Sequence, residues 1–309
     1  MLNKINPNSM ISIKKWGFLA FWLAVLPVLP MAAYMGRDTG TQDYWAWLIY
    51  FTVFGIVPAL DYLVGKDPTN PDENNDVPKL SKERIYRLFP MILALVWFGA
   101  LFFAGHIYAS NNYSLLGKIG WILSTGTLGG AIGIVVAHEL VHKDERIENW
   151  LGGLLLSSVC YAGFKVEHIR GHHVFVATPD DGASANFNES VWHFLPRALK
   201  HNFLTAWQLE AGYLKRKGKK ALSVHNELIW WYAISALFTA AFYSLWGWQG
   251  ALFFLLVGLV AGSTLEKIGF DKTISSSALD ELHQAAIKLV PLLDKLTVER
   301  QWAGLRPGT

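Results

Sequence analysis

The chain has 309 residues, of which 52% are hydrophobic and only 17% are charged, and its formal net charge is +3. Soluble globular domains carry about 25% charged residues, and nucleic-acid-binding domains gather Lys and Arg into a basic stripe. The composition therefore excludes a typical soluble domain, argues against a nucleic-acid partner and indicates a membrane protein.

Apolar segments follow one another along the chain, and a helix needs about 20 apolar residues to cross a bilayer. One apolar run, residues 150–164, is too short for a crossing and predicts a buried or interfacial helix, whereas six others are long enough. The sequence thus predicts an all-α membrane protein with six transmembrane helices, the last two joined as a hairpin at Trp246-Gly247-Trp248. The six predicted spans are residues 16–34, 44–64, 88–109, 115–137, 228–245 and 248–265.

Positive charge is concentrated in two of the polar connections, residues 65–87 and residues 138–227. In a six-span arrangement both connections lie on the same side of the membrane. Loops rich in Lys and Arg stay in the cytoplasm. We therefore predict that both termini and the segment 138–227 are cytoplasmic.

Two groups of histidines lie in that cytoplasmic segment. One is His138-Glu-Leu-Val-His142, where the fourth predicted span ends, and the other is His168-Ile-Arg-Gly-His172-His173. Residues four apart share one face of a helix, and neutral imidazole binds Fe, Zn and Cu. Ionisable groups at the membrane edge are usually functional, so we predict that all five histidines are metal ligands. The remaining histidines are read as surface or structural residues: His106, His193, His201, His225 and His283.

The identity of the metal has more than one reading. The stretch HELVH fits the H-E-x-x-H pattern of zinc metalloproteases, with Glu139 as general base. A protease of that kind needs only one further ligand, whereas five imidazoles favour two metal ions and suit non-haem iron. A third reading is a non-catalytic membrane protein that binds at most one metal ion.

Two glutamates accompany the histidines, and each has two readings. Glu139 and Glu167 could orient ligand imidazoles from behind, as carboxylates do in many metal sites. Alternatively they could form simple salt bridges with Lys143 and Arg170. The sequence leaves both readings open and assigns no catalytic residue.

The stretches HELVHK, EHIRGHH and ALDYLVGKDPTNP resemble the integral-membrane alkane hydroxylases (alkane 1-monooxygenases). The resemblance covers about residues 10–266. That family is related to xylene monooxygenases and, more distantly, to membrane fatty-acid desaturases. The resemblance implies six transmembrane helices in the bacterial inner membrane and a cytoplasmic non-haem di-iron centre. It also implies terminal hydroxylation of an alkane with O2 and electrons from rubredoxin.

An alkane offers no polar group, so a site that binds it must recognise apolar shape. Aromatic residues of the second predicted span could line such a pocket, or they could simply pack against neighbours and lipid. These residues are Trp45, Trp47, Tyr50, Phe51 and Phe54.

The tail departs from the family pattern. The family carries further histidine motifs after the sixth span, whereas residues 267–309 contain only His283. Residues 275–296 predict an amphipathic helix, and residues 298–309 resemble a stretch of FAD-dependent glycine oxidases, without the G-x-G-x-x-G motif that binds FAD. We therefore predict a truncated alkane-hydroxylase-like domain, 1–266, fused to an unrelated tail, 267–309. Five imidazoles fill about one iron site, which leaves the activity of this chain open.

Overall fold

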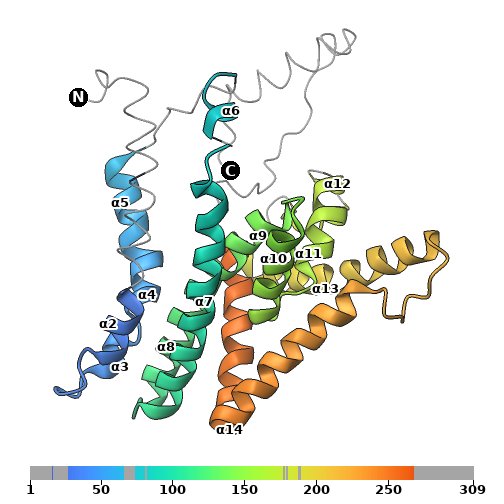
Figure 1. Ribbon diagram of the computed structural model, residues 1–309. Helices are drawn as coiled ribbons and strands as arrows, with labels where there is room; N and C mark the ends of the chain where they lie inside the picture. The colour runs from blue at the N-terminus through green and yellow to red at the C-terminus, as the bar shows by residue number, and fades with distance from the viewer. Residues whose placement is uncertain are drawn as a thin grey trace. The chain divides into compact units, whose positions relative to one another are not determined.

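The computed structural model describes Trp16 and residues 27–65, 74–80, 82–176, 178, 180–186 and 189–267. Every regular element among these residues is a helix (Figure 1). The chain divides into two compact units. The first contains Met1–Lys165 and Ile229–Thr264, and the second contains Val166–Leu228 and Leu265–Thr309.

Three helices in the described part of the chain are long and apolar enough to cross a membrane: Ile85–Ser110, Leu115–Val141 and Glu227–Ser263. The first is α7 (Ile85–Ser110). The second is continuous through α8 (Leu115–Leu128), the π-helical turn η3 (Gly129–Ile134) and α9 (Val135–Val141). The predicted third and fourth spans are therefore confirmed as helices.

Helix α14 (Glu227–Lys267) reverses direction near its middle. Trp246 has a φ of −137° and Gly247 has a φ of +66°, a left-handed conformation that glycine adopts without strain. The ring of Phe242 lies 6.3 Å from that of Phe253 and 5.2 Å from that of Phe254. In a straight helix, residues twelve apart would be separated by about 18 Å. The two arms therefore pack antiparallel, which confirms the predicted hairpin.

The second predicted span, 44–64, is helical but interrupted. It contains α3 (Gln42–Trp45), α4 (Leu48–Phe51), the π-helical turn η2 (Thr52–Ile56) and α5 (Val57–Val64). Pro58, in the first turn of α5, has no N–H to donate, which accounts for a break in the regular hydrogen-bond ladder here. The apolar stretch Leu48–Val64 is shorter than a usual crossing.

The ends of the chain are only partly described. Of the first predicted span the structure describes Trp16 and residues 27–34, including α2 (Val28–Tyr34). A short helix, α6 (Val77–Leu80), lies in the predicted polar loop 65–87. The amphipathic helix predicted for 275–296, and the rest of the tail from 268 onward, lie outside the described residues.

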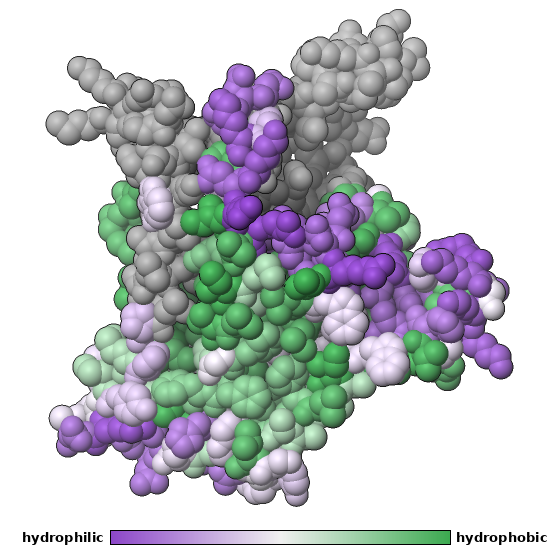
Figure 2. Space-filling model, in the orientation of Figure 1, coloured by the Kyte–Doolittle hydropathy of each residue, from purple (hydrophilic) through white to green (hydrophobic). Residues whose placement is uncertain are grey.

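The surface of the first unit is broadly apolar along its long helices, as the green area of Figure 2 shows. Ile92 and Leu95 of α7 are more than half exposed, as are Leu237 and Leu259 of α14. Exposed apolar surface of this extent marks contact with another apolar phase. It is the surface that a lipid bilayer would cover.

Inside the first unit, two tryptophans join neighbouring helices. The Trp97 indole donates a hydrogen bond to Ser158 Oγ at 2.9 Å, and the Trp121 indole donates one to the carbonyl of Ala104, also at 2.9 Å. Both rings are fully buried. A buried indole needs such a partner for its N–H, so these bonds fix how α7 packs against α8 and against α10 (Arg146–Ser158).

Helix α8 approaches α14 at Gly126. A Cβ at this position would overlap Val260 Cβ and lie 3.1 Å from the carbonyl of Val257. We expect Gly126→Ala to destabilise the protein by about 1–3 kcal/mol, because the two helices must move apart. Thermal unfolding of the detergent-solubilised protein measures the change. Gly99→Ala is the matched control, since nothing lies within 4 Å of a Cβ there. Equal stability of the two variants would show that this packing contributes nothing.

The second unit is built on α13 (Val191–Arg216), a helix that the sequence analysis does not predict. Ser190 caps its first turn by accepting a hydrogen bond from the His193 amide. Its buried residues recur every four positions, which is the pattern of an amphipathic helix with one buried face. They are Phe194, Ala198, Asn202, Ala206, Glu210 and Leu214.

Candidate metal centre

The first histidine pair belongs to the first unit. His138 lies on α9 and His142 caps its C-terminal end, and their ring centroids are 4.9 Å apart. The Asn149 side chain donates a hydrogen bond to the carbonyl of Val141 at 2.8 Å and so satisfies this helix end. The predicted spacing therefore brings these two imidazoles together on one side of the helix.

The second group belongs to the segment α11 (Phe164–Glu167), η4 (His168–His172) and α12 (His173–Phe175). The turn η4 is π-helical, so residues five apart are brought onto the same face. His168 Nε2 and His173 Nε2 lie 3.0 Å apart. Spacing alone pairs His168 with His172, whereas the π-helical turn makes His168 and His173 the pair whose nitrogens converge.

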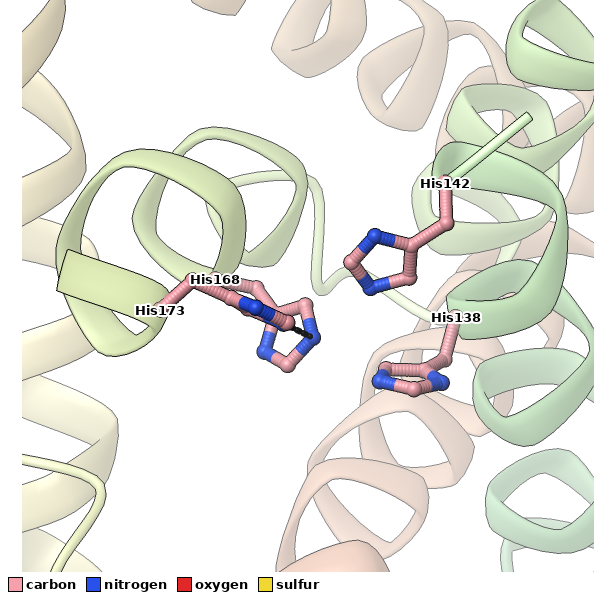
Figure 3. A group of neighbouring side chains, drawn as sticks. All are labelled: His138, His142, His168 and His173. Carbon is pink, nitrogen blue, oxygen red and sulfur yellow. Dashed lines mark hydrogen bonds between the residues drawn. The ribbon is translucent and has the colours of Figure 1, made fainter. Parts of the chain in front are cut away.

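This pair suits a metal ion. A tetrahedral zinc ion holds imidazole nitrogens at about 2.1 Å, which places two such nitrogens about 3.4 Å apart. His168 Nε2 and His173 Nε2 lie 3.0 Å apart, within a few tenths of an ångström of that spacing. Figure 3 shows these two imidazoles together with His138 and His142, each pair on its own helical segment. Neutral imidazoles, which each pair offers, are donors that fit a first-row transition metal.

His172 does not join the His168–His173 pair but contacts a carboxylate. Its Nδ1 lies 3.0 Å and 3.1 Å from the two carboxylate oxygens of Asp181, and both side chains are buried. Burial alone would raise the pKa of Asp181, but hydrogen bonds from His172, from Ser184 and from the Ala183 amide hold it below the ordinary value. A carboxylate behind an imidazole is the usual way in which proteins orient a metal-binding histidine.

Glu167, next to His168, is also buried. It accepts a hydrogen bond from the Asn202 side chain at 3.4 Å, and its carboxylate lies 3.9 Å from His201 Nε2. Burial raises its pKa to about 7, although the nearby His172 and the bond from Asn202 act in the opposite direction. Its partners are therefore on α13, and Arg170 does not pair with it.

Of the two salt bridges considered for the glutamates, the one between Lys143 and Glu139 forms, whereas the one between Arg170 and Glu167 does not. Lys143 Nζ lies 2.5 Å from Glu139 Oε1 in a salt bridge between largely exposed side chains. Arg170 donates to Glu210 and, at 2.7 Å, to Glu227. The guanidinium of Arg170 also lies 4.5 Å from the centroid of the Tyr213 ring. Arg170 thus ties the histidine-bearing turn η4 to α13 and to the start of α14.

Sequence reasoning missed Asp181, although a signal for it exists. The acidic pair Asp180-Asp181 followed by glycine lies only nine residues after His172. An Asp before a glycine is typical of a turn, and a carboxylate so close to a histidine group is a candidate partner for it. The buried Glu210 has no comparable signal, because a glutamate within a polar helix usually reads as exposed.

Comparison with known proteins links the site to a family. Residues 113–275, which include all five predicted ligands, match the family model described as fatty acid desaturase. The alkane 1-monooxygenase 2 of Alcanivorax borkumensis is 58% identical over 270 residues, covering 87% of this chain and 71% of that protein. The alkane 1-monooxygenase 2 of Pseudomonas aeruginosa is 48% identical over 271 residues, covering 87% of this chain and 72% of that protein.

A more distant relative has a different substrate in its name. The xylene/toluene monooxygenase hydroxylase component XylM of Pseudomonas putida is 26% identical over 206 residues, covering 66% of this chain and 53% of that protein. The similarity to the two alkane monooxygenases is much higher and extends over more of the chain.

Proposed function

Because the chain belongs to the alkane 1-monooxygenase family, we propose that it hydroxylates the terminal carbon of alkanes with O2. The observation that carries the proposal is the 58% identity to an alkane 1-monooxygenase over 87% of the chain. The identity to the xylene/toluene component is 26%, which favours an alkane over a methyl group on an aromatic ring. The site adds histidines that could hold the metal on which such chemistry depends.

The proposed ligands of a first metal ion are His138, His142, His168 and His173. The covalent chain supports their grouping. The Phe164 ring lies 6.3 Å from the His138 ring, and Phe164 begins the helical segment that reaches His168 four residues later. Residues four apart on a helix lie about 6 Å apart, so only one helical turn of chain separates His168 from a ring beside His138.

The proposed metal is non-haem iron, present as a pair of ions in line with the family resemblance. Such iron, when held by these histidines, would supply the activation of O2 that lets one oxygen atom enter a C–H bond while the other leaves as water. The reaction balances as RH + O2 + 2 e⁻ + 2 H⁺ → ROH + H2O. His172 is not in the first group of four histidines and is the ligand proposed for the second iron. Its Nδ1 is taken by Asp181, which leaves Nε2 for the metal ion.

The apolar helices supply the only recognition that an alkane allows. The aromatic rings of the second predicted span contact one another. The centroid of the Tyr50 ring lies 4.9 Å from that of Phe54 and 6.0 Å from that of Trp47. Phe51 is mostly exposed, while Trp47 and Tyr50 are half-buried. We propose that the half-buried rings contribute to an apolar pocket that excludes water from the substrate.

The surroundings of the enzyme are part of the same proposal. We propose a multi-pass protein of the bacterial inner membrane, with six spans and cytoplasmic termini. The three described helices of membrane-spanning length support a location in a membrane. The segment 138–227, rich in Lys and Arg, would then face the cytoplasm. Rubredoxin is the proposed electron donor, as the resemblance to the alkane hydroxylases implies.

The direct test is hydroxylation by the purified chain in proteoliposomes. We expect reduced rubredoxin, O2 and octane to yield 1-octanol, measured by gas chromatography with mass detection. Metal analysis of the same sample should give iron, near two ions per chain. A single zinc ion with peptidase activity would instead support a metalloprotease, and a protein without metal would support a non-catalytic relative. Product from p-xylene alone would contradict the alkane assignment.

A further inference from the structure

We propose that Arg197 is a positioning residue of the metal centre, which acts on His172 through the loop that carries Asp181. The inference rests on the proposed function, since it takes His172 as a metal ligand. All the residues involved lie in the second unit. The Asp181 loop is defined here as residues 180–186.

Asp181 contacts His172 directly. Both carboxylate oxygens lie within 3.1 Å of His172 Nδ1, and the Asp181 side chain is fully buried. The carboxylate can only accept a hydrogen bond here, so His172 carries its proton on Nδ1. That tautomer presents the lone pair of Nε2, which is the form that binds a metal ion.

The Asp181 carboxylate is held by hydrogen bonds within its own loop. Asp181 accepts hydrogen bonds from the Ala183 amide at 3.0 Å and from Ser184 Oγ at 2.6 Å. These bonds orient the side chain relative to its own loop. They do not attach the loop to the rest of the unit, so the position of the carboxylate depends on what holds the loop.

Arg197, on α13, provides that attachment. Its guanidinium donates to the carbonyl oxygens of Gly182 at 3.3 Å and of Ser184 at 2.9 Å. It also forms a bidentate salt bridge with Glu189. Its Nε donates to Oε1 at 2.8 Å and its Nη2 donates to Oε2 at 2.7 Å. Glu189 in turn accepts from the Asn186 amide at 2.9 Å. The planar fork of arginine can make these bonds at once, whereas the single ammonium of lysine cannot.

A single side chain therefore connects the middle of the Asp181 loop, and through Glu189 its C-terminal end, to a long helix. Without it the loop keeps its internal hydrogen bonds and the packing of Gly182 against His201, but loses its hydrogen bonds to α13. The expected consequence is weaker orientation of His172 and weaker iron binding, with little change in the helices themselves. Replacing the outer partners of metal-binding histidines typically weakens metal binding 10- to 100-fold.

The test measures the iron affinity of the purified full chain by competition with a chelator of known strength. We expect Arg197→Ala to weaken iron binding about 10-fold and Asp181→Asn to weaken it at least as much. Because both act through His172, the double variant should be no more than about twofold weaker than Asp181→Asn alone. The iron affinity of Arg197→Lys should fall between those of the wild type and Arg197→Ala. If the alanine variant does not fold, the lysine variant tests the positioning role in its place.

Lys200→Ala is the matched control. It removes a cation one turn further along α13, where the side chain is exposed, and should leave iron affinity unchanged. Unchanged affinity in Arg197→Ala, or losses that multiply in the double variant, would overturn the positioning role while leaving the proposed function intact. A wild-type chain that binds no iron would overturn the proposed function, and the positioning role with it.

Discussion

Replacing His168 with alanine is expected to abolish both iron binding and alkane hydroxylation. The imidazole is almost fully buried, and its Nε2 lies 3.0 Å from that of His173, so its removal takes away one of the two nitrogens that converge there. Loss of an outer partner of a ligand costs 10- to 100-fold, and loss of the ligand itself should exceed about 100-fold. Iron per chain and 1-octanol formation are the two measurements.

His225→Ala is the control for this experiment. His225 is exposed in the loop before α14, and its removal should leave both iron content and activity unchanged. Thermal unfolding of the metal-free proteins separates loss of a ligand from loss of the fold. A His168→Ala chain that retains iron and activity would show that η4 is not part of the metal centre.

Replacing Arg170 with alanine is expected to destabilise the protein by about 3 kcal/mol. Its guanidinium binds Glu210, whose side chain is only 2% exposed, and Glu227, at 2.7 Å. Removing one partner of a buried ion pair typically costs 3–5 kcal/mol, because the other charge is left buried without compensation. The lower end applies because the Arg170 side chain is one-third exposed. Unfolding of the metal-free protein by denaturing detergent measures the loss.

A second variant tests the mechanism of that loss. Glu210→Gln removes the buried charge, so in this background Arg170→Ala should cost less than it does alone. Lys215→Ala, an exposed cation near the end of α13, is the control and should change stability by less than about 0.5 kcal/mol. Equal costs of Arg170→Ala in both backgrounds would show that its contact with Glu210 contributes nothing to stability.

The long apolar helices were predictable because their signal is composition over many residues. The predicted spans 88–109 and 115–137 lie within the observed helices Ile85–Ser110 and Leu115–Val141. The hairpin at Gly247 was predictable for a similar reason, since a glycine between two tryptophans interrupts a long apolar run. Helix α13 was not predictable, because its buried face includes Asn202 and Glu210, and polar residues of this kind usually indicate an exposed face in a sequence.

The site was predictable only as far as spacing reaches. The pair His138 and His142 follows from a regular helix. The choice of partners for charged groups does not follow from spacing, because it depends on contacts between distant segments. Arg170 thus binds Glu210 and Glu227, forty and fifty-seven residues away, and not the nearby Glu167. Asp181 reaches His172 only because its loop folds back on the histidine-bearing segment.

The π-helical turn η4 makes the second histidine group intolerant of changes in chain length. In a regular α-helix, residues five apart point about 140° away from each other, yet here His168 and His173 bring their Nε2 atoms together. Deleting Ile169 would restore a regular turn while placing the two histidines four apart. Inserting a residue there would rotate them away from each other. Length variants between these histidines should therefore be rarer among functional relatives than substitutions at Ile169 itself.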